Sequence, residues 1–421
     1  MDSISPAVTA KKAPLLSNLV LLFLIAMILA NVGGNMYGPL LPLYLEDLGA
    51  GIAQIGLFFT LAQVIPLALQ ILGGWISDTI GRLRAIAFGS IAGVFAYVAL
   101  ILSPTWQWLL LASAFLAIGS SLVGPSFDAF IAENSSEENR AKVFGITQAL
   151  FMIVSVIGPV LGGWLAGMFG FKFMFLIAAG LYLFATAIRI AMARHALRGQ
   201  EANPRRLSLE SLKTNLGTMF GLIVAGGVIT WILLTDGVRD ISFALSMNLF
   251  SVYMEKYGGL TIIQIGLMNS IFGLFMMLTT IPGGWLADKA GERVNIVIGF
   301  VLIGVALGML VYIPAGLIAL YVMGWALAGM GVGLMTPAYQ SLISKAVPQK
   351  VRGTAFGLFS TSLGLVSLPA PWIGAQLWER VSPRFPFVIT AVVSVLSVIP
   401  VWFKFKLPRN VAGNGNGEKA E

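Results

Sequence analysis

Long apolar runs separated by short polar connections form most of this chain. An apolar run of about 20 residues is long enough to cross a lipid bilayer as a helix. The alternation therefore predicts an all-α integral membrane protein with twelve transmembrane helices. The expected helices lie at 17–45, 53–76, 84–102, 107–132, 142–168, 171–193, 218–254, 262–286, 294–313, 315–344, 353–378 and 386–403.

A polar phrase that ends one apolar run occurs a second time. Residues 73–82 read GGWISDTIGR, and residues 283–293 read GGWLADKAGER. The register continues beyond the phrase, since Pro125, Arg140, Gly145 and Pro159 are matched by Pro337, Arg352, Gly357 and Pro371. A parallel repeat in a membrane protein is typical of transporters. It predicts two pseudo-symmetric bundles of six helices each.

Composition excludes several other classes of protein. Hydrophobic residues make up 57% of the chain and charged residues 10%, against roughly 25% charged in a soluble domain. There is no cysteine, and His195 is the single histidine. The sequence contains no phosphate-binding loop, no Ser-His-Asp arrangement and no metal-ligand spacing. We therefore expect no enzymatic activity, no cofactor and no metal.

The basic residues predict how the chain lies in the membrane. All of the 26 Lys and Arg residues, except those named at the end of this paragraph, fall in segments or helix ends on one side. That excess indicates a multi-pass protein of the cell membrane with both termini in the cytoplasm. The same excess explains the net charge of +8, so no nucleic acid partner is implied, and membrane lipids are the expected neighbours of the basic residues. The exceptions are Lys172, Lys256, Arg380, Arg384 and Arg239.

This topology divides the chain into five parts. We expect a cytoplasmic N-terminal tail at 1–16, a six-helix bundle at 17–193, a cytoplasmic linker at 194–217, a second bundle at 218–404 and a disordered tail at 405–421. The linker is either a surface-lying amphipathic helix or a plain solvated connection. We expect a monomer.

The repeated phrase resembles the loop signature of the major facilitator superfamily, on Gly74, Asp78, Gly81 and Arg82. Two further motifs resemble its twelve-helix drug:proton antiporter branch. They are Pro39-x-x-Pro42 and the motif formed by Gly158, Pro159, Gly162 and Gly163, which is partial because Val154 replaces its upstream glycine. The alternative interpretation of the glycines is ordinary close packing of helices. The resemblance implies alternating access around a central cavity.

The resemblance also implies a gate at the repeated loop. Asp78, Arg82 and Asp128 would form the network that stabilises the outward-facing state, and Asp288 and Arg293 would belong to the second copy. That copy departs from the pattern, since Glu292 replaces the arginine and Gln340 stands where Asp128 does. We therefore expect a weaker latch in the second half. A tight glycine turn with a helix cap is compatible with this interpretation.

Ionisable residues inside the membrane are the strongest candidates for chemistry. Asp236, Arg239 and Asp240 lie near the middle of the segment 218–254, on one helical face. Arg239 can neutralise only one of the two carboxylates, so the other can bind and release a proton. We predict that these three residues couple transport to protons. The alternative is a structural ion pair that fixes this helix against a neighbour.

Uncharged polar residues suggest where a substrate lies. Asn31 and Asn35 share a helical face, and Asn31 aligns with Asp240 in the repeat. We predict a substrate cavity lined by Asn31, Asn35, Tyr37 and Asn248, although the asparagines could equally bond a neighbouring helix. Four methionines, at positions 247, 268, 276 and 277, either line an adaptable pocket or fill space in the packing.

The sequence therefore predicts a secondary active transporter. The preferred function is proton-coupled efflux, as a multidrug antiporter, of a small amphiphilic or drug-like compound. Proton-linked transport of a sugar, organic acid or lipid is the alternative, and a non-transporting receptor or scaffold is a third possibility. The intramembrane charges and the intact first loop argue against the third.

Overall fold

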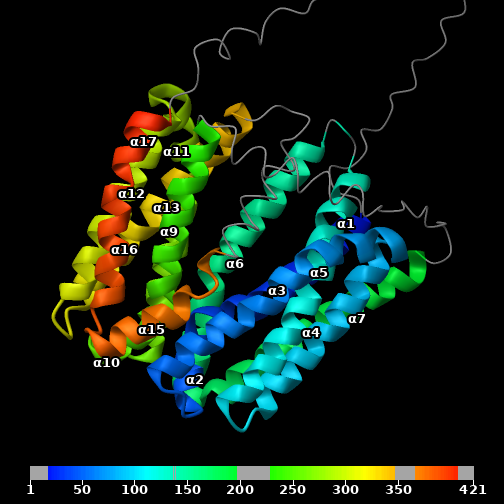
Figure 1. Ribbon diagram of the computed structural model, residues 1–421. Coiled ribbons are helices and arrows are strands. Elements are labelled where there is room, and N and C mark those ends of the chain that lie inside the picture. Colours follow the sequence, from blue (N-terminus) through cyan, green and yellow to red (C-terminus); the bar gives the residue numbers. More distant parts are fainter. Residues whose placement is uncertain (1–17, 136, 138, 197–227, 347–365, 406–421) are drawn as a thin grey trace, which may run out of the picture.

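The computed structural model describes residues 18–135, 137, 139–196, 228–346 and 366–405, apart from the side chains of residues 70–80 and 195–196. All regular structure in these residues is helical (Figure 1). The expected linker at 194–217 and the two expected tails lie almost wholly outside the described residues. The helices form two groups, and each group comes from one half of the chain.

The first half supplies six long helical segments, and all six coincide with expected ones. They are α1 (Asn18–Tyr37) with η1 (Gly38–Leu40) and α2 (Leu41–Asp47), α3 (Ile52–Ile80), α4 (Arg82–Leu102), η2 (Trp106–Trp108) with α5 (Leu109–Glu133), α6 (Arg140–Phe169) and α7 (Phe171–Ala196).

The second half repeats this order. It contains α9 (Val228–Ser246) with η3 (Met247–Leu249) and α10 (Phe250–Lys256), α11 (Ile262–Ala290), α12 (Glu292–Tyr312), α13 (Ile318–Ala346), α15 (Ala370–Arg380), α16 (Phe385–Leu396) and α17 (Val398–Lys404). Among the described residues, ten helical segments are long and apolar enough to span a membrane. The segment with α9 carries the three charged residues, and the segment that ends in α15 begins outside the described residues.

The sequence repeat is visible in the backbone. A 3₁₀ turn interrupts the first helix of each half, as η1 in one and η3 in the other. Gly81 and Gly291 join the next two helices with the same conformation, at φ 91° in both. A positive φ strains residues that carry a Cβ atom, so glycine is needed at both turns. The two halves thus share their breaks as well as their helices.

Large apolar side chains cover much of the outer surface. Phe88, Phe95, Leu183 and Phe184 are each more than half exposed, and they lie on α4 and α7. A soluble protein rarely exposes apolar surface of this extent. The arrangement fits a lipid surrounding.

The two bundles touch at one end of the molecule, which we call the closed end. There α3 packs against α15, and α6 packs against α11. The hydroxyl of Ser251 on α10 donates to the carbonyl of Pro39 in η1, at 2.6 Å. Glu46 and Lys256 form an ion pair across the same boundary, and the backbone N–H of Ala53 donates to Glu379 at 2.9 Å.

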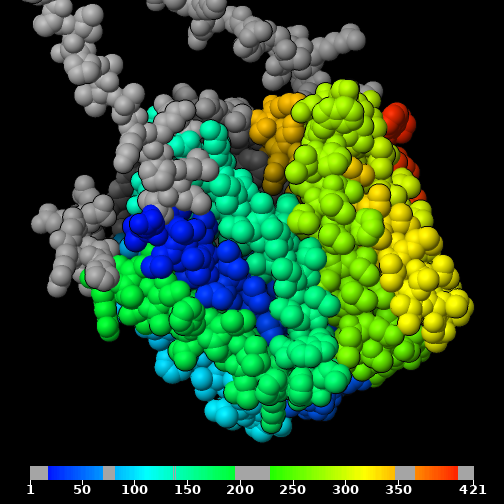
Figure 2. Space-filling model, turned by 180° about the vertical axis from the view of Figure 1, so that it is seen from behind, coloured from blue at the N-terminus to red at the C-terminus, as the bar shows by residue number. Residues whose placement is uncertain are grey.

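The bundles separate toward the opposite end, which we call the open end. Figure 2 shows α6 and α11 in contact low in the view and apart in its upper part. The close contact depends on glycine, because a Cβ atom on Gly163 would lie 2.9 Å from the Cα atom of Gly266 and 3.0 Å from the carbonyl oxygen of Ile262. Both of these atoms belong to the backbone of α11, so neither can turn aside.

We predict that Gly163→Ala destabilises the closed end. The added methyl group must push α6 away from α11, so the equilibrium should shift toward molecules whose closed end is open. Because the chain has no cysteine, a single Ser251→Cys reports on this directly. Its labelling by an impermeant maleimide should become several-fold faster in the Gly163→Ala background.

Gly145→Ala on the same helix is the matched control, since a Cβ atom at Gly145 meets nothing within 4 Å. An unchanged labelling rate in Gly163→Ala would show that the contact does not limit opening.

Candidate functional site

The helix α9 carries a compact group of three charged side chains. The Nη1 atom of Arg239 lies 3.0 Å from Oδ1 of Asp236. Its Nη2 and Nε atoms donate to Oδ1 of Asp240, at 2.8 and 3.0 Å. One guanidinium group therefore holds two carboxylates, as the spacing along the helix predicted. The three side chains carry a net charge of −1 when both acids are ionised.

The two acids differ in how far solvent reaches them. The side chain of Asp236 is 6% exposed, whereas that of Asp240 is 32% exposed. The guanidinium lies over the ring of Tyr339 on α13, with its carbon 5.4 Å from the ring centroid. The cluster thus ties α9 to α13 at its buried side and offers Asp240 at its accessible side.

The polar residues of α1 are held by their own helix. The side-chain amide of Asn31 donates to the carbonyl of Met27 at 2.8 Å, and that of Asn35 donates to the carbonyl of Asn31 at 2.9 Å. Both are half-buried, and their side-chain carbonyl oxygens have no hydrogen bond to a described residue. These oxygens can accept a hydrogen bond from a ligand.

The other two predicted cavity residues differ from the asparagines in their surroundings. Tyr37 is 8% exposed and packs against Tyr97 and Phe175 in the core of the first bundle. The structure therefore places this side chain among aromatic rings of its own bundle. Asn248 is half-buried in η3, at the 3₁₀ break of the second half.

The glycines of the Gly158–Gly163 motif serve two interfaces. Cβ atoms on Gly158 and Gly162 would collide with Asn35 and with the carbonyl of Met36, so one face of α6 fits tightly against α1. The other face carries Gly163, against α11. Pro159 lies inside α6, between Gly158 and Gly162 in the sequence. The motif thus connects the predicted cavity helix with the contact between the bundles.

Arg82 of the first gate loop forms an ion pair that the sequence did not predict. The side chain of Asp78 is outside the described part of the chain, as are the surroundings of Gly74. Arg82 lies 3.3 Å from Glu133, at the end of α5. Asp128 is exposed and precedes Glu133 by five residues, farther from that end. Among the described residues, Arg82 therefore forms an ion pair with Glu133, whereas the resemblance implied Asp128.

The second gate loop contains the same ion pair with its charges reversed. Glu292 takes the repeat position of Arg82, and it pairs with Lys345 on α13 and accepts a hydrogen bond from Ser341 at 2.8 Å. Lys345 follows Pro337 by eight residues, as Glu133 follows Pro125. The replacement of arginine by Glu292 is thus matched by a basic residue on the neighbouring helix.

The remaining residues of the second loop point elsewhere. Arg293 donates to the carbonyl of Trp402 at 3.0 Å and lies over its ring, and Asp288 is exposed. The structure thus brings Glu292 and Lys345 together and leaves Asp288 apart from them.

A second buried arginine was missed by sequence reasoning. Arg189 on α7 is 2% exposed, although the count of basic residues had assigned it to a helix end. It donates to the hydroxyl of Ser90 at 2.8 Å and to the sulfur of Met27 at 2.9 Å, and it lies near the ring of Tyr182. Its place inside the apolar run 171–193 was the available signal. It joins α1, α4 and α7 through a charge.

The comparisons with known proteins agree with the repeat and the fold. The family model of the Major Facilitator Superfamily matches residues 23–235 and 232–421. The chain therefore belongs to this superfamily, and it is a transporter that is not an enzyme. The resemblance seen in the gate loops is confirmed at the level of the family.

Two of the relatives are named for drug resistance, and one of these two is named as an efflux pump. A multi-drug resistance efflux pump PmrA homolog from Lactococcus lactis is 26% identical over 87% of this chain and 90% of its own length. A class C tetracycline resistance protein from Escherichia coli is 25% identical over 86% and 90%. An uncharacterized MFS-type transporter from Methanocaldococcus jannaschii is 28% identical over 89% and 92%.

Solved structures share the fold at low sequence identity. A bacterial homologue of the iron transporter ferroportin, in an inward-facing state, aligns with a TM-score of 0.74, at 16% identity over 91% of this chain and 98% of that one. A POT family transporter in complex with 5-aminolevulinic acid gives a TM-score of 0.73, at 15% identity over 91% and 95%.

We predict that the charges of the second gate pair can be exchanged. Glu292→Lys or Lys345→Glu alone places like charges together on a half-buried contact, so the melting temperature in detergent should fall. Each single change should also slow transport. The double variant restores an ion pair of the polarity found in the first half, and it should recover most of both losses.

Arg293→Ala is the control, because Arg293 contacts Trp402 and lies outside the pair. If the double variant is no better than the worse single one, the two side chains do not act as a pair.

Proposed function

We propose that this member of the Major Facilitator Superfamily is a proton-coupled exporter of a small amphiphilic or drug-like compound. The cluster of Asp236, Arg239 and Asp240 carries the proposal. A charged group in the membrane interior is costly, and such groups are kept where they take part in transport. Export is favoured by the antiporter-like motif on α6 and by the relatives named as a multi-drug efflux pump and as a tetracycline resistance protein.

Proton binding would change the charge of this cluster. With both carboxylates ionised, the net charge is −1, and a proton on Asp240 makes it zero. Arg239 would then be balanced by Asp236 alone, at 3.0 Å. A cationic or strongly polarised substrate is attracted to the first state and less to the second. Proton and substrate would therefore compete, which is the condition for exchange of one against the other.

The orientation we propose follows from the basic residues. The positive-inside rule places the two termini in the cytoplasm of the cell, so the open end would face the cytoplasm. The state described here would then be inward-facing, ready to take up substrate from that side. The contacts of Ser251, Lys256 and Gly163 would close the opposite side. Opening that side would require them to break.

The two gate loops would stabilise the outward-facing state, the alternative to the inward-facing state described here. We propose that Asp78, Arg82 and Asp128 form the network that stabilises the outward-facing state, in which the open end is closed, and that Glu133 also binds Arg82 in the state described here. The ion pair between Glu292 and Lys345 would take the place of the Arg82–Glu133 pair in the second half. The two halves would then carry opposite charges at equivalent positions.

The deciding test separates coupling from binding. We predict that Asp240→Asn abolishes uphill transport driven by a pH gradient, by tenfold or more. Exchange of substrate across the membrane without a gradient should keep much of its rate, because the cavity remains intact. Inside-out vesicles with an imposed pH gradient, screened with cationic dyes, sugars and organic anions, give both measurements. Asp236→Asn is measured in the same way.

Asp47→Asn is the matched control, since Asp47 is an exposed acid on α2. If Asp240→Asn and Asp236→Asn both still concentrate substrate, the cluster is structural. Movement of substrate in the same direction as protons would instead favour uptake of a sugar, organic acid or lipid.

A further inference from the structure

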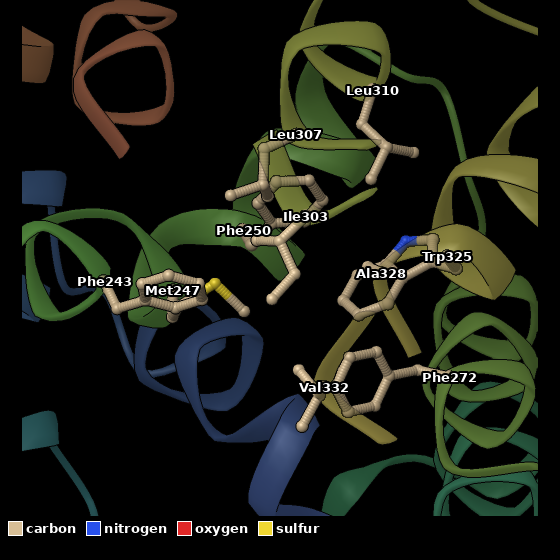
Figure 3. A pocket seen from close by; sticks show the side chains of 10 residues that line it. All are labelled: Phe243, Met247, Phe250, Phe272, Ile303, Leu307, Leu310, Trp325, Ala328 and Val332. Carbon is tan, nitrogen blue, oxygen red and sulfur yellow. The ribbon is translucent and has the colours of Figure 1, made fainter. Parts of the chain in front are cut away.

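The second bundle contains an apolar pocket that lies next to the charged cluster. Its volume is about 40 Å³. Figure 3 shows the lining side chains around one space, with Phe243 and Met247 on one side and Phe272 and Trp325 on the other. They come from α9, η3, α10, α11, α12 and α13. The remaining lining residues are Phe250, Ile303, Leu307, Leu310, Ala328 and Val332.

No polar atom contributes to the pocket. All ten lining side chains are apolar or aromatic, and the indole N–H of Trp325 is turned toward the sulfur of Met254, at 3.1 Å. A cavity without hydrogen-bonding groups gives water no partner, so it stays dry and can take an apolar ligand. The rings of Phe250 and Phe272 stand edge-on to that of Trp325, with centroids 5.3 and 5.8 Å away.

The pocket has a buried floor and an accessible mouth. Ile303, Leu307 and Leu310 of α12 are buried and form the floor. The mouth consists of the half-buried lining residues, which lie on α9, η3, α11 and α13, and they are Phe243, Met247, Phe272 and Val332. An apolar group can therefore enter from the side of α9, while the floor stops it.

The mouth shares a helical face with the acids. Phe243 follows Asp240 by three residues and Met247 follows it by seven, so these side chains lie along one face of α9 and η3. At 1.5 Å per residue, Phe243 and Met247 lie about 5 and 10 Å from Asp240 along the helix axis. An elongated molecule could keep its polar end near Asp240 while its apolar end enters the pocket.

We infer that this pocket binds the apolar terminal group, an alkyl chain or the edge of an aromatic ring, of an amphiphilic substrate. Sites that hold a whole drug-sized ligand have about 300–1,000 Å³, so 40 Å³ admits only one end of such a molecule. The inference rests on the proposed function for the substrate class. Beyond the proposed function, the inference names the residues that select the length of the apolar group, which are those that line the pocket.

The test measures binding to the purified full-length protein. The probes are alkyltrimethylammonium ions with butyl, hexyl and octyl chains, titrated by calorimetry in detergent. In the unaltered protein each methylene that enters the pocket should tighten binding by about fourfold. Ala328→Leu fills the pocket and should remove this gain for the longer chains. It should leave butyl binding within about twofold, which also shows that the variant is folded.

A second variant should act in the opposite direction. Leu307→Ala deepens the pocket at its floor, so the octyl ion should bind more tightly than it does to the unaltered protein, and it should be the tightest binder of the three probes. Ala319→Leu is the control for Ala328→Leu, because Ala319 is an exposed alanine on α13, the helix that carries Ala328. It should match the unaltered protein.

Several outcomes would overturn the inference. Equal dependence on chain length in all four proteins would show that the chains do not reach the pocket, as would no dependence in the unaltered protein. A dependence on the detergent's chain length instead would mean that the pocket takes a lipid chain. Binding needs no pH gradient, so a failure of proton coupling in Asp240→Asn leaves these results unchanged.

Discussion

The cost of placing charge inside a lipid bilayer determines much of this structure. A charged side chain at the centre of a transmembrane helix costs about 2.5–3.5 kcal/mol on insertion scales. The protein meets this cost in two different ways. Arg239 is balanced by two carboxylates on its own helix. Arg189, in contrast, is surrounded by a hydroxyl, a sulfur atom and an aromatic ring. The Arg239 cluster contains carboxylates, whose charge changes when a proton binds. The hydrogen-bond partners of Arg189 among the described residues are all uncharged, so its surroundings offer no such change.

Close packing of helix backbones is the second constraint. In lipid, helices gain little from the hydrophobic effect between them, so contact at short range has to supply the attraction. The helix α6 uses Gly158 and Gly162 toward α1 and Gly163 toward α11. The first contact lies within a bundle and the second lies between bundles. A helix that is fixed on one face and can separate on the other is suited to transmit motion.

The sequence predicted the architecture because its repeat and its apolar runs are long and redundant. The helical segments follow from the lengths of the apolar runs, and the three charges on one face of α9 follow from their spacing. The turns at Gly81 and Gly291 follow from the repeated motif and its resemblance to the loop signature of the family. The Glu292–Lys345 pair was missed because the repeat shows two separate changes of charge, glutamate for Arg82 and lysine for Glu133. The structure shows that the two changed residues lie on neighbouring helices and form an ion pair. Tyr37 was placed in the cavity because its helical face could not be fixed where η1 begins.

The two halves are similar in backbone and different in chemistry. The first bundle fills its centre with the rings of Tyr37, Tyr97 and Tyr182, which end at Arg189. The second carries acids and a dry pocket at corresponding depth. A symmetric backbone lets both halves move in the same way, while the differences place the proposed proton site and the dry pocket in the second half and the two asparagines of the predicted cavity in the first. Asp240 and Phe243 lie on one face of α9 just before the 3₁₀ turn at η3, and Met247 begins that turn, so a change in the turn would reach both the acid and the mouth of the pocket. Under the proposed function, proton binding and release of the apolar group would then occur in one movement of α9.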